Sequence, residues 1–92
     1  MEQYTTYAVE KAVELLAIDS PTGFTKVAAD WVKKEFEALG FSATLTNKGG
    51  VLVDLGGADA ENALLLEAHT DTLGGMVAEV KGNGRLRLTN LG

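Results

Sequence analysis

The residues best suited to chemistry lie in one short stretch, LLLEAHTDTLGG, at residues 64–75. This stretch holds His69, the only histidine of the chain, and Asp71 follows two residues later. A neutral imidazole is a common zinc ligand, and its second ring nitrogen usually needs an anchoring acceptor. If the chain curls here, the carboxylate of Asp71 reaches that nitrogen and fixes the tautomer of His69. We therefore consider His69 a candidate metal ligand and Asp71 the group that orients it.

A purely structural role for the same residues stays open, because the pattern H-x-D is short. A histidine beside an apolar strand is often a hydrogen-bonded structural residue, and Asp71 would serve equally well as a turn cap. Gly74 and Gly75 follow. Two glycines allow the backbone to turn tightly and to approach another segment closely.

Other kinds of catalytic and binding site find little support in the sequence. The chain has no cysteine, which excludes disulfides, thiolate zinc sites and cysteine nucleophiles. It contains neither a G-x-S-x-G nucleophile motif nor a G-x-G-x-x-G loop after a strand. The glycines of KGNG, residues 81–84, indicate a hairpin turn rather than a phosphate loop.

Length and charge limit the class of protein further. Ninety-two residues make at most one small domain. The net charge is −5 and the eight Lys and Arg residues are scattered, which argues against a nucleic-acid partner. No apolar run approaches the roughly 20 residues that a membrane span needs, so no membrane partner is expected. The N-terminus has acidic residues and no secretory signal layout, so we expect a cytoplasmic location.

Two helices are expected to precede the strands. The first is predicted from about Thr5 to Ala17, ending before the breakers of DSPTG, residues 19–23. Its apolar face has helical spacing and consists of Val9, Ala12, Val13 and Leu16. The second is predicted to begin near Thr22 or Gly23 and to end before Gly40, which suits a left-handed cap.

The remaining residues either alternate between apolar and polar or form a continuous apolar run, and both patterns are typical of strands. Strands are predicted at residues 41–46, 51–55, 63–68, 75–80 and 85–90, the last two forming a hairpin around KGNG. The run ALLLEA, residues 63–68, suits a central strand covered on both faces. His69 would then lie at its carboxyl end, where open α/β sheets bind ligands. The expected fold is α/β, with two N-terminal helices packed on a mixed sheet.

Residues 64–92, LLLEAHTDTLGGMVAEVKGNGRLRLTNLG, resemble the region around the first metal ligand of the glutamyl and deblocking aminopeptidases. These are cytosolic cocatalytic metallopeptidases that form tetrahedral assemblies, and some members are labelled endoglucanases. Thr70 stands where the family has Met. The N-terminal part, LLAIDSPTGFTKVAADWVKKEFEALGF, is similar to the paired N-terminal helices of the family and the Ser/Gly loop between them.

The resemblance implies a fold, a reaction and roles for two residues. His69 matches the first metal ligand, and Asp71 matches the carboxylate that orients it for catalysis. Family members use two divalent ions, usually zinc or cobalt, to activate water and polarise the scissile carbonyl while removing N-terminal residues from peptide substrates. A dizinc-exopeptidase-like catalytic domain, a cytoplasmic location and a homo-oligomer are the corresponding expectations.

The resemblance also implies that residues 1–92 are the N-terminal portion of a catalytic domain. Family members bear a bridging Asp, a Glu general base, further carboxylates and a second His later in the chain, and residues 1–92 are expected to end near the start of the inserted β domain of the family. We therefore expect residues 1–92 to hydrolyse no peptide alone, and to dimerise or aggregate through unpaired strand edges. Two alternatives stay open: a related dizinc exopeptidase or deacylase acting on acylated amino acids, and a non-catalytic assembly module.

Overall fold

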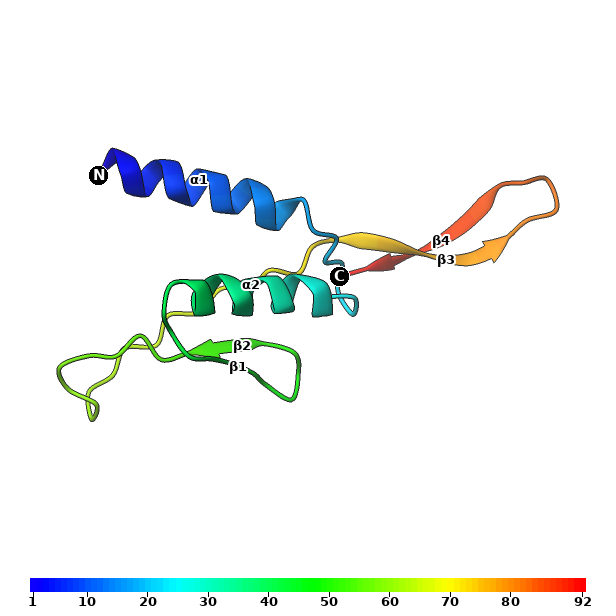
Figure 1. Ribbon diagram of the computed structural model, residues 1–92. Coiled ribbons are helices and arrows are strands. Elements are labelled where there is room, and N and C mark those ends of the chain that lie inside the picture. The colour runs from blue at the N-terminus through cyan, green and yellow to red at the C-terminus, as the bar shows by residue number, and fades with distance from the viewer.

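A computed structural model describes residues 1–92 and contains two helices followed by four strands (Figure 1). In chain order these are α1 (Glu2–Leu16), α2 (Lys26–Ala38), β1 (Ala43–Leu45), β2 (Val51–Val53), β3 (Gly74–Val80) and β4 (Leu86–Leu91). β1 pairs antiparallel with β2, and β3 pairs antiparallel with β4. The strands thus form two separate two-stranded sheets. The combination of helices and sheets confirms an α/β chain, whereas the expected single mixed sheet is wrong.

Both helices lie close to their predicted positions and differ from them at their starts. α1 begins at Glu2 rather than near Thr5 and ends at Leu16, one residue before the predicted end at Ala17. α2 begins at Lys26 rather than near Thr22 or Gly23, because the residues before it close a turn in which the Phe24 amide donates to the Pro21 carbonyl at 2.8 Å. The predicted left-handed cap at Gly40 is confirmed by its φ of 95°.

A short turn closes each of the two hairpins, and the second is the predicted KGNG turn. Between β1 and β2, the Thr46 amide donates to the Gly50 carbonyl at 2.8 Å. Between β3 and β4, the Lys81 amide donates to the Arg85 carbonyl at 2.8 Å across the KGNG turn. Alternating apolar residues with a glycine-rich turn between them are a strong local signal, which explains why the second hairpin was predictable.

The predicted central strand at residues 63–68 is wrong. This segment has no regular structure, and Leu64, Leu65 and Leu66 are 83%, 72% and 79% exposed. A strand covered on both faces needs a neighbour on each edge. No strand of the chain pairs with this segment, so the apolar run forms no ladder hydrogen bonds of its own.

Only the second helix packs on strands. α2 lies along the β1–β2 hairpin, whereas α1 contacts only α2 (Figure 1). The buried apolar side chains are all alanines, from α2 and β1: Ala28, Ala29 and Ala43. α1 is tied to α2 by an ion pair, with 2.9 Å between Lys11 Nζ and Glu35 Oε2. The prediction that both helices pack on a sheet is therefore correct for α2 alone.

The molecule is extended and exposes much apolar surface. Its radius of gyration is 17.6 Å, whereas a compact domain of this length has about 12 Å. The accessible surface is 7816 Å², against about 5,100 Å² for a compact protein of this mass. The predicted apolar face of α1 is present but uncovered, with Leu16 73% exposed. Neither helix has the length and hydropathy that crossing a bilayer requires.

Candidate functional site

His69 is positioned by a crossing between two segments far apart in the sequence. The turn that follows α1 lies beside the segment that leads into β3. The Thr72 amide donates to the Ser20 carbonyl at 2.8 Å, and the Thr22 amide donates to the Thr72 carbonyl at 3.2 Å. These two bonds form a parallel bridge between Pro21 and Thr72. The bridge fixes the backbone directly after His69.

Ser20 adds a side-chain bond to the same crossing. Its hydroxyl donates to the carbonyl of Thr70 at 2.9 Å, and the residue is only 3% exposed. Ser20 is the one buried polar residue of the chain. A buried hydroxyl that lost this acceptor would be left unsatisfied, which costs more than the bond itself contributes. Ser20 therefore helps to hold the carbonyl next to His69 in place.

The imidazole of His69 is held at one nitrogen. Nδ1 lies 2.9 Å from Asp71 Oδ1 and 3.2 Å from the Asp71 backbone oxygen. A carbonyl and an ionised carboxylate both accept hydrogen bonds, so the proton of the neutral ring is assigned to Nδ1. Nε2 is then the nitrogen with the free electron pair. The side chain is 86% exposed, which leaves Nε2 accessible.

Asp71 joins His69 to the turn after α1. Its second oxygen, Oδ2, accepts a hydrogen bond from the hydroxyl of Thr22 at 2.8 Å. The bond from Thr22, followed by that from His69, lowers the pKa of Asp71 below its usual value. The carboxylate is therefore ionised at neutral pH and engaged through both oxygens.

Gly74 permits the close approach of the two crossing segments. A Cβ at this position would lie 2.6 Å from Cβ of Pro21. Real side chains do not approach so closely, so Pro21 packs directly against the backbone of β3. The predicted close approach is thus present at Gly74, although both glycines lie within β3 rather than in a turn.

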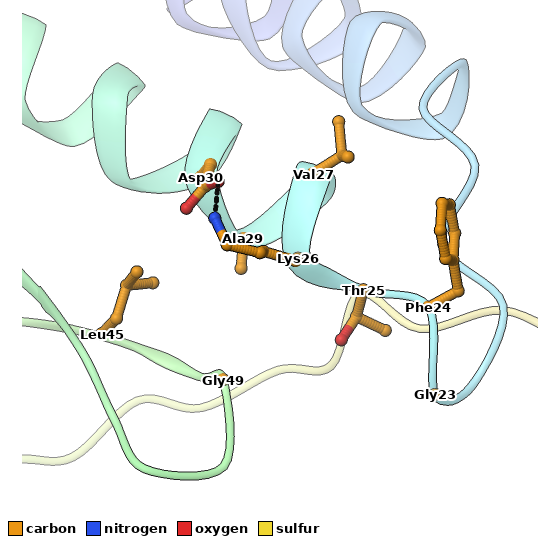
Figure 2. Close-up of a pocket in the computed structure, with 9 residues that line it drawn as sticks. All are labelled: Gly23, Phe24, Thr25, Lys26, Val27, Ala29, Asp30, Leu45 and Gly49. Atoms are coloured by element: carbon orange, nitrogen blue, oxygen red, sulfur yellow. Dashed lines mark hydrogen bonds and ion pairs between the residues drawn. The ribbon is translucent and has the colours of Figure 1, made fainter.

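The site opens into a hollow of about 370 Å³ between the crossing and the β1–β2 hairpin. Its charged and polar lining includes Thr22, Lys48, His69 and Asp71. A second hollow, of about 230 Å³, lies between the start of α2 and the same hairpin. Figure 2 shows Leu45 and Gly49 on its hairpin side, and the ion pair of Lys26 with Asp30 on its helix side. This second hollow contains neither of the predicted site residues.

The site can supply one nitrogen ligand in a fixed orientation. Nε2 of His69 has the tautomer and exposure that a divalent cation requires of an imidazole, and Asp71 is an anchoring acceptor of the kind that metal-binding histidines use. The structure brings together no group of three or more His, Asp and Glu side chains that could hold an ion.

Comparison with known proteins places this site in a family context. A sequence model described as M42 glutamyl aminopeptidase matches residues 49–92, which include His69 and Asp71. These residues are similar to the M42 glutamyl aminopeptidases. The resemblance found from the sequence alone is thereby confirmed.

Two curated relatives cover almost the whole chain. An aminopeptidase-named protein of Bacillus subtilis, YhfE, is 36% identical over 84 residues, which is 91% of this chain and 24% of the relative. The glutamyl aminopeptidase of Lactococcus lactis subsp. cremoris is 31% identical over 85 residues, 90% of this chain and 24% of that protein. The chain therefore matches about a quarter of the length of these relatives.

The sequence indicated part of this site and missed the rest. The contact between His69 and Asp71 has the predicted form, whereas the metal role of His69 stays a prediction. Thr22 and Ser20 were not singled out as site residues. A serine and a threonine beside a proline carry no signal of a partner some 50 residues away, so the local pattern gave no means of finding them.

Proposed function

We propose that this chain supplies the N-terminal part of the catalytic domain of a cocatalytic metallo-aminopeptidase, which removes N-terminal residues from peptides. His69 provides one ligand to the first of two divalent ions, zinc or cobalt. Asp71 holds the ring of His69 from the opposite side. The relatives that match the chain are named aminopeptidases, which supports this reaction over the deacylase and assembly-module alternatives.

The observation that carries the proposal is the orientation of His69. Nδ1 is engaged by Asp71 at 2.9 Å while Nε2 stays exposed. A structural histidine uses its polar atoms to satisfy buried partners, whereas this ring has one anchored nitrogen and one free nitrogen. That division is the one expected of a metal ligand with a carboxylate behind it.

The residues of this chain would hold and orient rather than complete the reaction. A bound pair of divalent ions supplies Lewis-acid chemistry, activating water and polarising the scissile carbonyl. His69 contributes one nitrogen, and a catalytic zinc usually has three protein ligands. The proposal therefore assigns the other ligands and the general base to residues outside these 92, so residues 1–92 alone should release no amino acid.

A chimaera tests the function directly. Residues 1–92 replace the matching quarter of the L. lactis glutamyl aminopeptidase, and release of the N-terminal residue is measured on peptides that begin with Glu or with Leu. We expect release that depends on added zinc or cobalt and stops with a chelator. His69→Ala should abolish it, and Asp71→Asn should lower it about 10- to 100-fold.

Lys81→Ala is the matched control, because Lys81 lies in the hairpin turn away from the site and should leave activity unchanged. Circular dichroism and gel filtration establish that each variant folds and assembles as the parent chimaera does. Full metal-dependent activity in a folded His69→Ala chimaera would contradict the proposal.

A further inference from the structure

We propose that Thr22 is a positioning residue for His69 and acts through Asp71. Its hydroxyl holds the carboxylate that keeps the imidazole proton on Nδ1, which leaves Nε2 free to bind a metal. The consequence for metal binding rests on the proposed function. The hydrogen bonds that link Thr22, Asp71 and His69 do not depend on the proposed function, and they are tested separately.

The first support is the division of labour within the carboxylate of Asp71. Oδ2 accepts from Thr22 Oγ1 at 2.8 Å, and Oδ1 lies 2.9 Å from His69 Nδ1. A carboxylate held through one oxygen rotates readily about its terminal torsion, which is a broad, roughly two-fold one. Held through both oxygens, it presents a fixed acceptor to the imidazole.

The second support is that Thr22 is itself held firmly. Its amide donates to the Thr72 carbonyl at 3.2 Å, and the turn that contains it is closed by the bond from Phe24 to Pro21. Pro21, the residue before Thr22, packs against the backbone of Gly74. The hydroxyl of Thr22 is thus presented from a backbone bonded directly to the segment that contains Asp71.

The third support is that little else orients His69. Its side chain is 86% exposed, so packing against neighbours restrains the ring only weakly. Both hydrogen-bond contacts of its ring are made with Asp71, one through the carboxylate and one through the backbone oxygen. The orientation of the ring therefore depends on Asp71, and the orientation of the carboxylate depends on Thr22.

Nitrogen NMR of the histidine ring tests this inference on the full chain. His69 is the only histidine, so ¹⁵N-histidine labelling gives one ring to follow without assignment. In the neutral ring, we expect the tautomer with the proton on Nδ1 to predominate. A predominant Nε2–H tautomer in the unsubstituted chain would overturn the proposal before any variant is made.

Thr22→Val removes the hydroxyl and preserves the shape of the side chain. The ratio of the Nδ1–H to the Nε2–H tautomer should fall roughly three- to tenfold, as the loss of one hydrogen bond predicts. Thr22→Ser should restore the ratio, because it restores the donor. Thr89→Val, in β4 and without a side-chain hydrogen bond, is the matched control and should change nothing.

An unchanged ratio in a folded Thr22→Val chain would show that Thr22 is only a turn residue. If Thr22→Val does not fold, Thr22→Ser decides: a folded serine variant with the ratio of the unsubstituted chain supports the inference, and one with a lowered ratio overturns it.

The chimaera gives a second readout and separates the two proposals. There the apparent affinity for Zn²⁺ should weaken roughly three- to tenfold in Thr22→Val, a smaller loss than removal of the anchoring carboxylate causes. If His69→Ala is inactive but Thr22→Val binds zinc as Thr89→Val does, the positioning inference fails and the proposed function stands. If the tautomer ratio responds to Thr22 but His69→Ala remains active, the proposed function fails instead.

Discussion

Gly74→Ala should loosen the crossing that positions His69. The added Cβ would lie 2.6 Å from Cβ of Pro21, and carbon atoms pack at about 3.5–4.0 Å, so one segment must move by about 1 Å. The proline ring cannot rotate away, and the backbone itself has to shift. Overpacking of this kind costs about 1–3 kcal/mol.

The shift should also reach the site. The bond of 2.8 Å between Thr22 and Asp71 lies next to Pro21 and would exceed hydrogen-bond range after a displacement of about 1 Å. We expect a lower midpoint in urea unfolding, followed by the fluorescence of Trp31, the only tryptophan. The tautomer ratio of His69 should fall as it does in Thr22→Val.

Gly75→Ala provides the matched control one residue later in β3. Its Cβ would meet Cδ1 of Leu88 at 3.6 Å, an ordinary contact. Replacing glycine where the backbone accepts a side chain commonly stabilises by about 0.4–1 kcal/mol. Equal stability and equal tautomer ratios in the two alanine variants would refute the reasoning, because only Gly74 faces Pro21.

Three further predictions concern the rest of the molecule. The hydrogen bond that Lys11 donates to Glu35, ahead of those it donates to Glu14, raises the pKa of Lys11 above 10.5. The contribution of this ion pair to docking α1 on α2 is therefore present below pH 10.5 and lost as the pH rises through the raised pKa, and we expect the loss to change Trp31 fluorescence. Lys11→Met should abolish that alkaline change. Gly84 has a φ of 83°, so Gly84→Ala should destabilise the β3–β4 hairpin by about 1–2 kcal/mol. The Lys81 amide should then exchange its hydrogen faster, and an unchanged exchange rate would contradict this prediction. The exposed run at 64–66 should drive self-association, so Leu65→Lys should lower the sedimentation coefficient at high concentration; a monomeric parent chain would contradict this.

The parts of the fold that were predictable depend on neighbours in the sequence. The KGNG turn and the alternation around it define the β3–β4 hairpin locally, and the apolar spacing defines both helices. The start of α2 was misplaced because Pro21 and Phe24 close a turn, and turn residues and helix-start residues are drawn from the same small set of types. The ends of helices and strands are therefore less predictable than the presence of the helices and strands themselves.

The central strand was wrong for a different reason. The apolar run at 63–68 indicates a segment that favours burial, but pairing depends on where other strands lie. The contacts of the site also differ in whether local sequence or the tertiary fold determines them. His69 and Asp71 are two residues apart, so their contact follows from local spacing, whereas the contact of Thr22 with Asp71 spans 49 residues and depends on the tertiary fold.

The crossing of the α1–α2 turn with the segment before β3 also has a kinetic consequence. It closes a loop of about 50 residues, and the entropy of closing such a loop is about 3.5 kcal/mol before a constant term. The four hydrogen bonds that hold it contribute about 1 kcal/mol each. These opposing quantities nearly cancel, so the crossing should form late in folding and open early in unfolding. The arrangement around the imidazole would then exist only when the two ends of this long loop have met, and slow exchange of the Thr22 and Thr72 amides would mark that event.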